Sequence, residues 1–240
     1  MVLVDGEKPM IELKNITKRF NNHIALEGLD LTVKTGEIYG LLGANGAGKS
    51  TTINLILGFL QPDSGTIRIG GQDKSPTIAS DKIGYIPENV TLYPYLSGLE
   101  NLDYFTRLTG RSYTKSELRE LLKKCGLQAD AHGKRLSEYS KGMRQKVGIA
   151  IAYAKDAQVY LLDEPASGLD PYASNQLSEI LKMLAADGAT ILMASHDIFR
   201  VRESCDRIGI LKQGKLLHEI LSSDVTSNEL ESLYLNFIKD

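Results

Sequence analysis

The chain has 240 residues, which is long enough for one large domain with a substantial core. Its 28 lysines and arginines are balanced by 30 aspartates and glutamates, which argues against a nucleic-acid partner because general nucleic-acid binders carry a basic excess. Cys125 and Cys205 are too few and too far apart for a disulfide framework or a zinc site, so we expect reduced thiols in a cytosolic protein.

The first ten residues, MVLVDGEKPM, contain two acids and no long apolar core, so no signal peptide is predicted. The longest apolar stretches, such as VGIAIAYA at 147–154, are far shorter than the roughly 20 residues that span a bilayer. We therefore expect a soluble chain. If it works at a membrane, another subunit must do the spanning.

The N-terminal third is predicted to form strands. Segments 10–13 (MIEL) and 29–33 (LDLTV) alternate apolar with polar residues, which is typical of antiparallel strands with one exposed face. Segment 38–42 (IYGLL) is almost wholly apolar and predicts a strand buried on both faces. Further strands are predicted at 66–71, after the turn signal PDSG, and at 82–86.

The pattern changes to helix from residue 97. Ser97 with Glu100, and Thr114 with Glu117, have the spacing of capping boxes and predict the starts of two helices. Residues 141–155 (KGMRQKVGIAIAYAK) carry apolar side chains at helical spacing and predict a third helix.

Strand patterns return at 158–163 and 190–195, and a hairpin is predicted at 207–220 around Gln213 and Gly214. Between the first two of these strands, Asp170 is suited to cap the start of a helix. The order of elements predicts one α/β domain over the whole chain.

We expect its core to comprise residues 1–87 and 158–240, including an antiparallel β-subdomain, and to be interrupted by a helical insertion at 88–157.

The segment GANGAGKST fits the pattern G-x-x-x-x-G-K-[ST] and lies between the apolar strand 38–42 and an apolar helix start, as a phosphate-binding loop requires. Backbone N–H groups of such a loop form a cradle for anions, Lys49 can reach the β and γ phosphates, and Ser50 can ligate Mg²⁺. A plain glycine-rich turn is the alternative. The predicted nucleotide-binding residues here are Gly43, Ala44, Asn45, Gly46, Ala47, Gly48, Lys49, Ser50 and Thr51.

The segment VYLLDEP at 159–165 places two acids at the end of an apolar strand. Asp163 is positioned to hold Mg²⁺, and Glu164 to orient and deprotonate an attacking water. Two solvated acids at a strand end would be the default for this dipeptide alone. Together with the phosphate loop they predict a site that hydrolyses a nucleotide.

Six motifs follow one another: the phosphate loop, IGYIPEN, YSKGMRQ, LLDEP, SGLD and SHD. This order resembles that of ABC-transporter ATP-binding subunits, and the resemblance covers almost the whole chain. It implies an ABC-type P-loop NTPase fold, with an antiparallel β-subdomain, a RecA-like core and an inserted helical subdomain. It also implies ATP and Mg²⁺ as cofactors.

The signature of that family is L-S-G-G-Q, and the matching residues here are Tyr139, Ser140, Lys141, Gly142 and Met143. Serine and the second glycine are retained and three positions depart. The resemblance implies that Ser140 and Gly142 contact the γ-phosphate of an ATP held by the opposite subunit, in a head-to-tail homodimer or with a paired ATPase subunit. The stretch alone also fits a capping serine followed by a solvated basic helix.

Four further residues gain roles from the resemblance. Glu88 stands where the family has glutamine and can still ligate Mg²⁺, or is a solvated loop acid. His196 matches a histidine that bonds a phosphate oxygen, and Asp170 an acid that links the two sites of the dimer. Phe20 matches the aromatic residue that stacks on adenine, with a core phenylalanine as the alternative.

The resemblance implies a separate membrane permease as partner, which would hold the chain at the cytoplasmic face of the membrane. Tyr93, Tyr95, Tyr104 and Phe105 are concentrated in one segment and are suited to receive a partner helix, although some will simply pack the helical insertion.

The motifs resemble the export and ABC-2 branch. Within it they resemble the ATPase of the copper-maturation system for nitrous oxide reductase, which also implies a periplasmic accessory protein.

Two other functions fit part of the sequence. A soluble ABC ATPase acting on a non-membrane partner usually has two such domains or a long coiled-coil insertion, and this chain has neither. A P-loop kinase or GTPase explains the phosphate loop but not the stretch 138–145 or Glu164.

Overall fold

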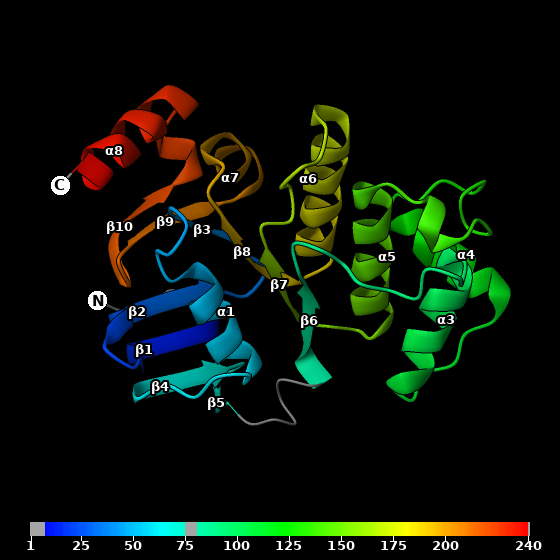
Figure 1. Ribbon diagram of the computed structural model, residues 1–240, viewed down its shortest axis with the longest axis horizontal. Coiled ribbons are helices and arrows are strands. Elements are labelled where there is room, and N and C mark those ends of the chain that lie inside the picture. The colour runs from blue at the N-terminus through cyan, green and yellow to red at the C-terminus, as the bar shows by residue number, and fades with distance from the viewer. Residues whose placement is uncertain (1–7, 75–80, 240) are drawn as a thin grey trace.

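The computed structural model describes residues 8–74 and 81–239. A six-stranded sheet in the order β10-β9-β3-β8-β7-β6 forms its centre (Figure 1). Its strands are parallel except for the antiparallel hairpin of β9 and β10, which turns at Gln213 and Gly214 as predicted. The strands are β3 (Ile38–Leu42), β6 (Ile83–Ile86), β7 (Val159–Asp163), β8 (Thr190–Ser195), β9 (Arg207–Lys212) and β10 (Lys215–Leu221).

The centre of this sheet is buried on both faces, which confirms the prediction from its continuous apolar runs. Along β7, Val159 and Leu161 belong to a hydrophobic cluster with the second sheet, whereas Tyr160 and Leu162 belong to a cluster with the helices on the other side. Successive side chains of a strand point to opposite faces, so a strand between two clusters must be apolar at every position.

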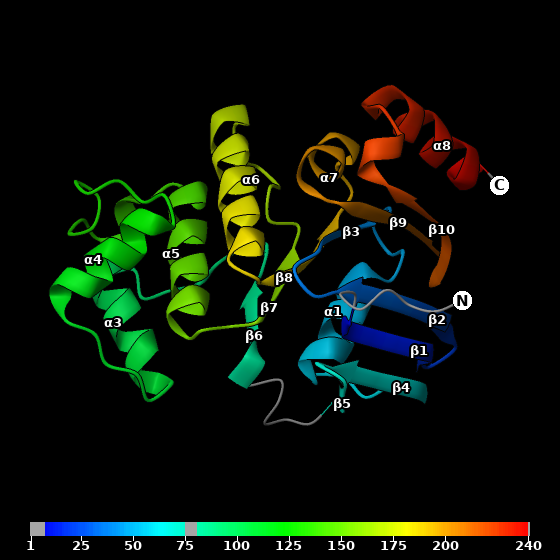
Figure 2. The same cartoon turned by 180° about the vertical axis from the view of Figure 1, so that it is seen from behind.

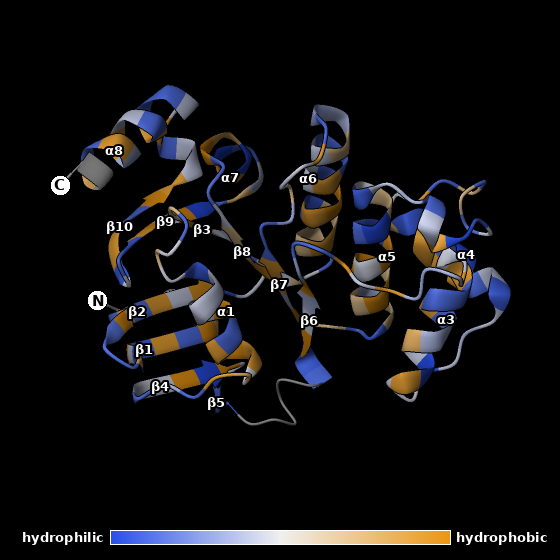
Figure 3. Ribbon diagram, in the orientation of Figure 1, coloured by the Kyte–Doolittle hydropathy of each residue, from blue (hydrophilic) through white to orange (hydrophobic). Residues whose placement is uncertain are grey.

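The second sheet has the order β2-β1-β4-β5 and carries bands of alternating hydropathy (Figure 3). Its first two strands are much longer than the predicted segments 10–13 and 29–33, because shifts of register interrupt the alternation along the β1–β2 pair. The strands are β1 (Pro9–Phe20), β2 (His23–Lys34), β4 (Ser64–Ile69) and β5 (Gln72–Asp73).

Three helices follow β6 in the chain and lie at one end of the molecule, far from α8 in both views (Figures 1 and 2). Both predicted capping boxes are confirmed: the side chains of Ser97 and Thr114 accept from the backbone three residues on, and Glu100 and Glu117 reach back. The helices are α3 (Gly98–Leu108), α4 (Lys115–Lys124) and α5 (Lys141–Ala154), with a short 3-10 helix η1 (Leu136–Glu138) before α5.

The remaining helices cover the central sheet. The predicted cap of α6 is confirmed, because the Asp170 side chain accepts a hydrogen bond of 2.8 Å from the Ala173 N–H. The helices α7 and α8 were not predicted. These elements are α1 (Lys49–Leu57), α6 (Pro171–Ala186), α7 (Ile198–Ser204), α8 (Ser227–Lys239) and a 3-10 helix η2 (Ser222–Asp224). Among the described residues no helix has the length and apolarity to span a membrane.

Candidate active site

The phosphate-binding motif forms the connection between β3 and α1, at the carboxyl end of a central parallel strand. Gly48 has a left-handed backbone with φ of 111°, and a Cβ there would lie 2.8 Å from the carbonyl oxygen of Ala25. A Cβ at Gly43 would lie 2.5 Å from the carbonyl oxygen of Leu211. Only glycine fits at these two positions, so the loop is packed tightly against its neighbours.

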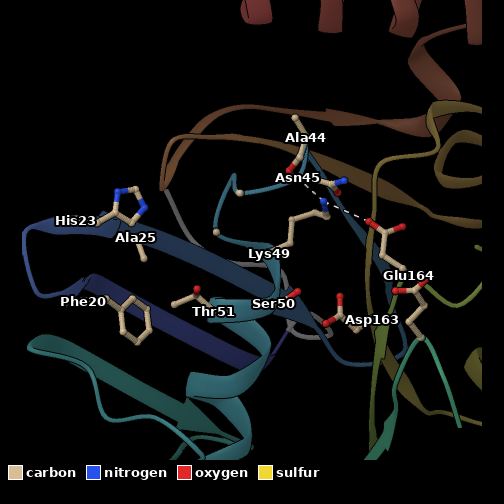
Figure 4. A pocket seen from close by; sticks show the side chains of 13 residues that line it. Phe20, His23, Ala25, Ala44, Asn45, Lys49, Ser50, Thr51, Asp163 and Glu164 are labelled. Atoms are coloured by element: carbon tan, nitrogen blue, oxygen red, sulfur yellow. Dashed lines mark hydrogen bonds and ion pairs between the residues drawn. The ribbon is translucent and has the colours of Figure 1, made fainter.

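Lys49 lies across this loop with a buried side chain. Its Nζ donates hydrogen bonds of 2.6 Å and 3.2 Å to the carbonyl oxygens of Gly43 and Ala44. The same Nζ lies 3.2 Å from Oε1 of Glu164 (Figure 4). The lysine charge is therefore held by the loop and by the candidate general base.

Glu164 directly follows β7. Its second carboxylate oxygen, Oε2, is bound by residues at the end of β8. Oε2 accepts hydrogen bonds from the Ser195 hydroxyl at 3.2 Å and from the His196 N–H at 3.3 Å, and it lies 3.0 Å from Nδ1 of His196. Glu164 itself has a φ of 48°, in the left-handed region that costs a side-chain-bearing residue energy. The structure thus brings Lys49, Glu164 and His196 together.

Asp163, the last residue of β7, faces Ser50 at the start of α1 (Figure 4). Burial raises the pKa of Asp163, a hydrogen bond from the Ser50 hydroxyl opposes this rise, and the charge of Glu164 adds to it. Its buried Oδ1 has no hydrogen-bond partner among the residues that the structure describes. A buried, unpartnered carboxylate oxygen beside a hydroxyl is a donor set that suits Mg²⁺.

These groups line a cavity of about 350 Å³. Phe20 and His23 lie at one end of the cavity, and Asp163 and Glu164 lie at the other (Figure 4). Phe20 is 42 % exposed, so it is not a core residue. The residues that line the cavity are Phe20, His23, Ala25, Ala44, Asn45, Gly46, Gly48, Lys49, Ser50, Thr51, Glu88, Asp163 and Glu164.

Sequence reasoning missed His23. It reaches the cavity because it pairs with Phe20 across the turn between β1 and β2. The Asn-Asn dipeptide between Phe20 and His23 is the sequence signal that could have predicted this hairpin. In the structure Asn21 has the positive φ, 51°, that is typical of such a turn.

The structure does not bring Ser140, Gly142 and Asp170 to this cavity. They line a smaller hollow of about 190 Å³ between the first turns of α5 and α6. Ser140 caps α5, because its Oγ accepts a hydrogen bond of 3.3 Å from the Met143 N–H. Any contact of these residues with a nucleotide must therefore involve a nucleotide that is not held by this chain's own phosphate loop.

Residues 26–167 match the sequence profile of the family described as ABC transporter. The chain belongs to this family. It resembles the linearmycin resistance ATP-binding protein LnrL of Bacillus subtilis (strain 168), with 36 % identity over 222 residues, which cover 91 % of this chain and 71 % of LnrL.

It also resembles the Nod factor export ATP-binding protein I of Burkholderia lata (strain ATCC 17760), with 35 % identity over 230 residues, which cover 92 % of this chain and 75 % of that protein.

Among solved structures, the dimeric ATP-binding cassette MJ0796 in a post-hydrolysis state with ADP and Pi has a TM-score of 0.78 and 29 % identity, covering 89 % of this chain and 99 % of that one. The predicted ABC ATPase fold is confirmed. This ABC transporter chain is an ATPase that couples ATP hydrolysis to transport.

Proposed function

We propose that this chain is the ATP-hydrolysing subunit of an export-type ABC transporter, acting on a separate membrane permease from the cytoplasmic face of the membrane. The observation that carries the hydrolytic part is the position of Glu164. One oxygen of its carboxylate is fixed by Ser195 and His196 and the other borders the phosphate loop. Two relatives named for resistance and export support the export part.

In this proposal Glu164 is the general base. When phosphate groups enter the loop they take the Nζ of Lys49 from Glu164 Oε1, because they offer it more negative charge. The freed carboxylate oxygen then orients a water and accepts its proton as the water attacks the γ-phosphate.

His196 holds the geometry of this base through its Nδ1. If the Nδ1 proton is shared with Glu164, the neutral ring has only a lone pair left at Nε2. A hydrogen bond from His196 to a phosphate oxygen therefore requires either a second ring proton or release of Glu164.

Ser50 and Asp163 are the residues that would hold Mg²⁺, with Glu88 at the edge of the same cavity. When bound there, the ion would neutralise charge on the phosphate oxygens. The unpartnered Oδ1 of Asp163 supports this assignment.

Phe20 is proposed to stack on adenine. Lys18 Nζ lies 5.6 Å from the ring centroid, and Phe20 is 42 % exposed within the lining of the cavity, so the ring is accessible to a base. We expect Phe20→Ala to raise the KM for ATP at least about five-fold, since stacking of a base on an aromatic ring contributes about 1–3 kcal/mol. The kcat should change little, because the contact is equal in ground and transition states.

Steady-state ATPase assays would check this, with Phe20→Tyr expected to retain the KM. An unchanged KM in Phe20→Ala would contradict the assignment, as would an equal rise for Phe59→Ala, whose exposed ring is not part of the cavity.

We further propose that two copies, or this chain and a paired ATPase, bind head to tail across two ATP molecules, with Ser140, Gly142 and Asp170 facing the partner's nucleotide. The dimeric form of MJ0796 supports this arrangement. So does the separate hollow that these residues line, because no residue of the phosphate loop is part of its lining.

The proposed permease contact is centred on Tyr95. Tyr93, Tyr104 and Phe105 contact one another with centroid distances of 5.0–6.0 Å, two pairs edge to face and one pair stacked, so part of each ring is used within the helical segment. Tyr95 makes no such ring contact with the residues that the structure describes, and at 83 % it is the more exposed residue. A large exposed aromatic residue beside such a cluster is suited to bind a partner helix.

We expect Tyr95→Asp to weaken co-purification with the permease at least about ten-fold while basal ATPase activity is retained, since a new charge would be buried at the contact. Pull-down from solubilised membranes and an ATPase assay measure the two quantities. Leu217→Asp, on β10 at the other end of the molecule, is the matched control. Loss of ATPase activity in parallel with binding would count against a docking role.

Two experiments test the proposed function as a whole. Purified chain should hydrolyse ATP in preference to GTP, and chain isolated from its own cells should bring down a membrane protein with several spans. A preference for GTP would favour a P-loop GTPase. Copurification with ribosomes or another soluble partner would favour a soluble ABC ATPase that acts on a non-membrane partner.

The copper-maturation role and its periplasmic protein gain no support from the relatives named above. In the part of the chain that the structure describes, no group of three or more His, Cys, Asp or Glu side chains is arranged to hold a metal ion on its own.

A further inference from the structure

Two of the motif positions that differ from the family pattern change the formal charge, and these two lie side by side. Glu88 stands in place of a neutral glutamine and Lys141 in place of a glycine. In the structure Lys141 Nζ lies 3.6 Å from Glu88 Oε1. The same oxygen accepts a hydrogen bond of 2.8 Å from the Ser167 hydroxyl. The two substitutions therefore form one ion pair, and their formal charges cancel.

This pair joins two parts of the proposed machinery. Glu88 lines the nucleotide cavity, while Lys141 is the first residue of α5 and follows the capping Ser140. Ser167 lies in the segment between Glu164 and α6. A Cβ added at Gly168 would lie 3.9 Å from Lys141 Nζ, so this glycine borders the space that the lysine occupies.

The pair is accessible enough to exchange partners. The side chain of Lys141 is 23 % exposed and that of Glu88 is 47 % exposed, so neither charge is locked in the core. A half-exposed ion pair contributes little net stability and is weakened by salt. A divalent cation near Glu88 can therefore compete with Lys141, because carboxylate oxygens are preferred ligands of Mg²⁺.

We propose that Glu88 is shared between two cations: it pairs with Lys141 while the cavity is empty and turns toward the Mg²⁺ of bound ATP when the cavity is filled. Filling a subunit's own site then releases Lys141 and the first turn of α5 to meet the nucleotide of the partner. This inference rests on the proposed function, since it needs ATP in the cavity and a partner opposite α5. Lys141 is a positioning residue in this scheme.

A zero-length cross-link tests the pairing directly. Carbodiimide couples a carboxylate to an amine only when the two are in contact, so peptides joining Glu88 to Lys141 should form in nucleotide-free protein. With ATP and Mg²⁺ in the Glu164→Gln background we expect their yield to fall at least three-fold. ATP with EDTA should leave the yield almost unchanged. The pair of Lys134 and Asp130, 2.9 Å apart on the surface, is the internal control and should not respond.

Affinity measurements give a second readout that does not depend on turnover. In the Glu164→Gln background, Lys141→Met should tighten the binding of Mg²⁺-ATP about two- to five-fold at low salt, because Glu88 loses its competing partner. When Glu88→Gln is also present, the same change should have no effect. High salt should abolish the tightening that is expected while Glu88 is retained. Lys134→Met, which removes a more exposed lysine charge that is also paired with a carboxylate, is the control.

The outcomes separate the two proposals. If the chain binds no ATP, the proposed function fails and this inference fails with it. If ATP binds but the cross-link yield stays constant, or falls equally with EDTA, the exchange of partners is wrong while the proposed function stands. Additive effects of Lys141→Met and Glu88→Gln on affinity would overturn the inference in the same way.

Discussion

Replacing Glu164 with glutamine is expected to lower kcat by about 10²–10⁴-fold, the usual contribution of a positioned general base. The amide is of equal size and keeps an oxygen to accept from Ser195 and the His196 N–H. It cannot take a proton from water. ATP should still bind, because the change also removes the negative charge that lies 3.2 Å from Lys49 Nζ.

Single-turnover hydrolysis, ATP titration and size-exclusion chromatography check this together. The variant should bind ATP at least as tightly as the unmodified chain and accumulate as a dimer when ATP is present. Glu120→Gln, at an exposed position of α4, is the control for loss of a carboxylate. Turnover within a few-fold of the unmodified chain would show that Glu164 is not the base.

Placing a negative charge at Ser140 should stop turnover while leaving the chain's own ATP site intact. Aspartate is as good a helix cap as serine, so Ser140→Asp should preserve α5 and the fold. Facing the γ-phosphate held by a partner, however, it would replace a donor with a like charge. Loss of a single well-placed donor to such a group costs about 10²–10³-fold in kcat, and we expect at least that loss here.

The informative comparison is with Ser140→Asn, which also caps the helix and adds similar bulk but no charge. We expect Asn to retain clearly more activity than Asp, and both to bind ATP as monomers with unchanged affinity, because Ser140 does not line the cavity of its own chain. Full turnover by Ser140→Asp would exclude a contact with the partner's phosphate and remove the basis for the head-to-tail dimer.

The three predicted helix caps at Ser97, Thr114 and Asp170 are confirmed, and the loop between β3 and α1 shares a cavity with the two acids at the end of β7. Each of these patterns depends on residues within a few positions of one another. Such patterns carry their own physical reason, so they can be recognised without knowing what packs against them.

What could not be predicted depends on residues that are distant in the sequence. The full length of β1 and β2 is hidden by irregular register, and α7, with seven residues, is too short for a clear helical period. The contact of Glu88 with Lys141, and the ring contacts of Tyr93 with Tyr104 and Phe105, exist only once β6, α3 and α5 are placed in space.

The backbone conformation of Glu164 sets the stability of the protein against its activity. A φ of 48° suits glycine or asparagine better than glutamate, by roughly 1–2 kcal/mol. Replacing Glu164 with glycine or asparagine would thus relieve this strain and also remove the proposed general base. A higher melting temperature therefore does not show that a variant of this chain is active, and screens for stabilised variants should also measure ATP hydrolysis.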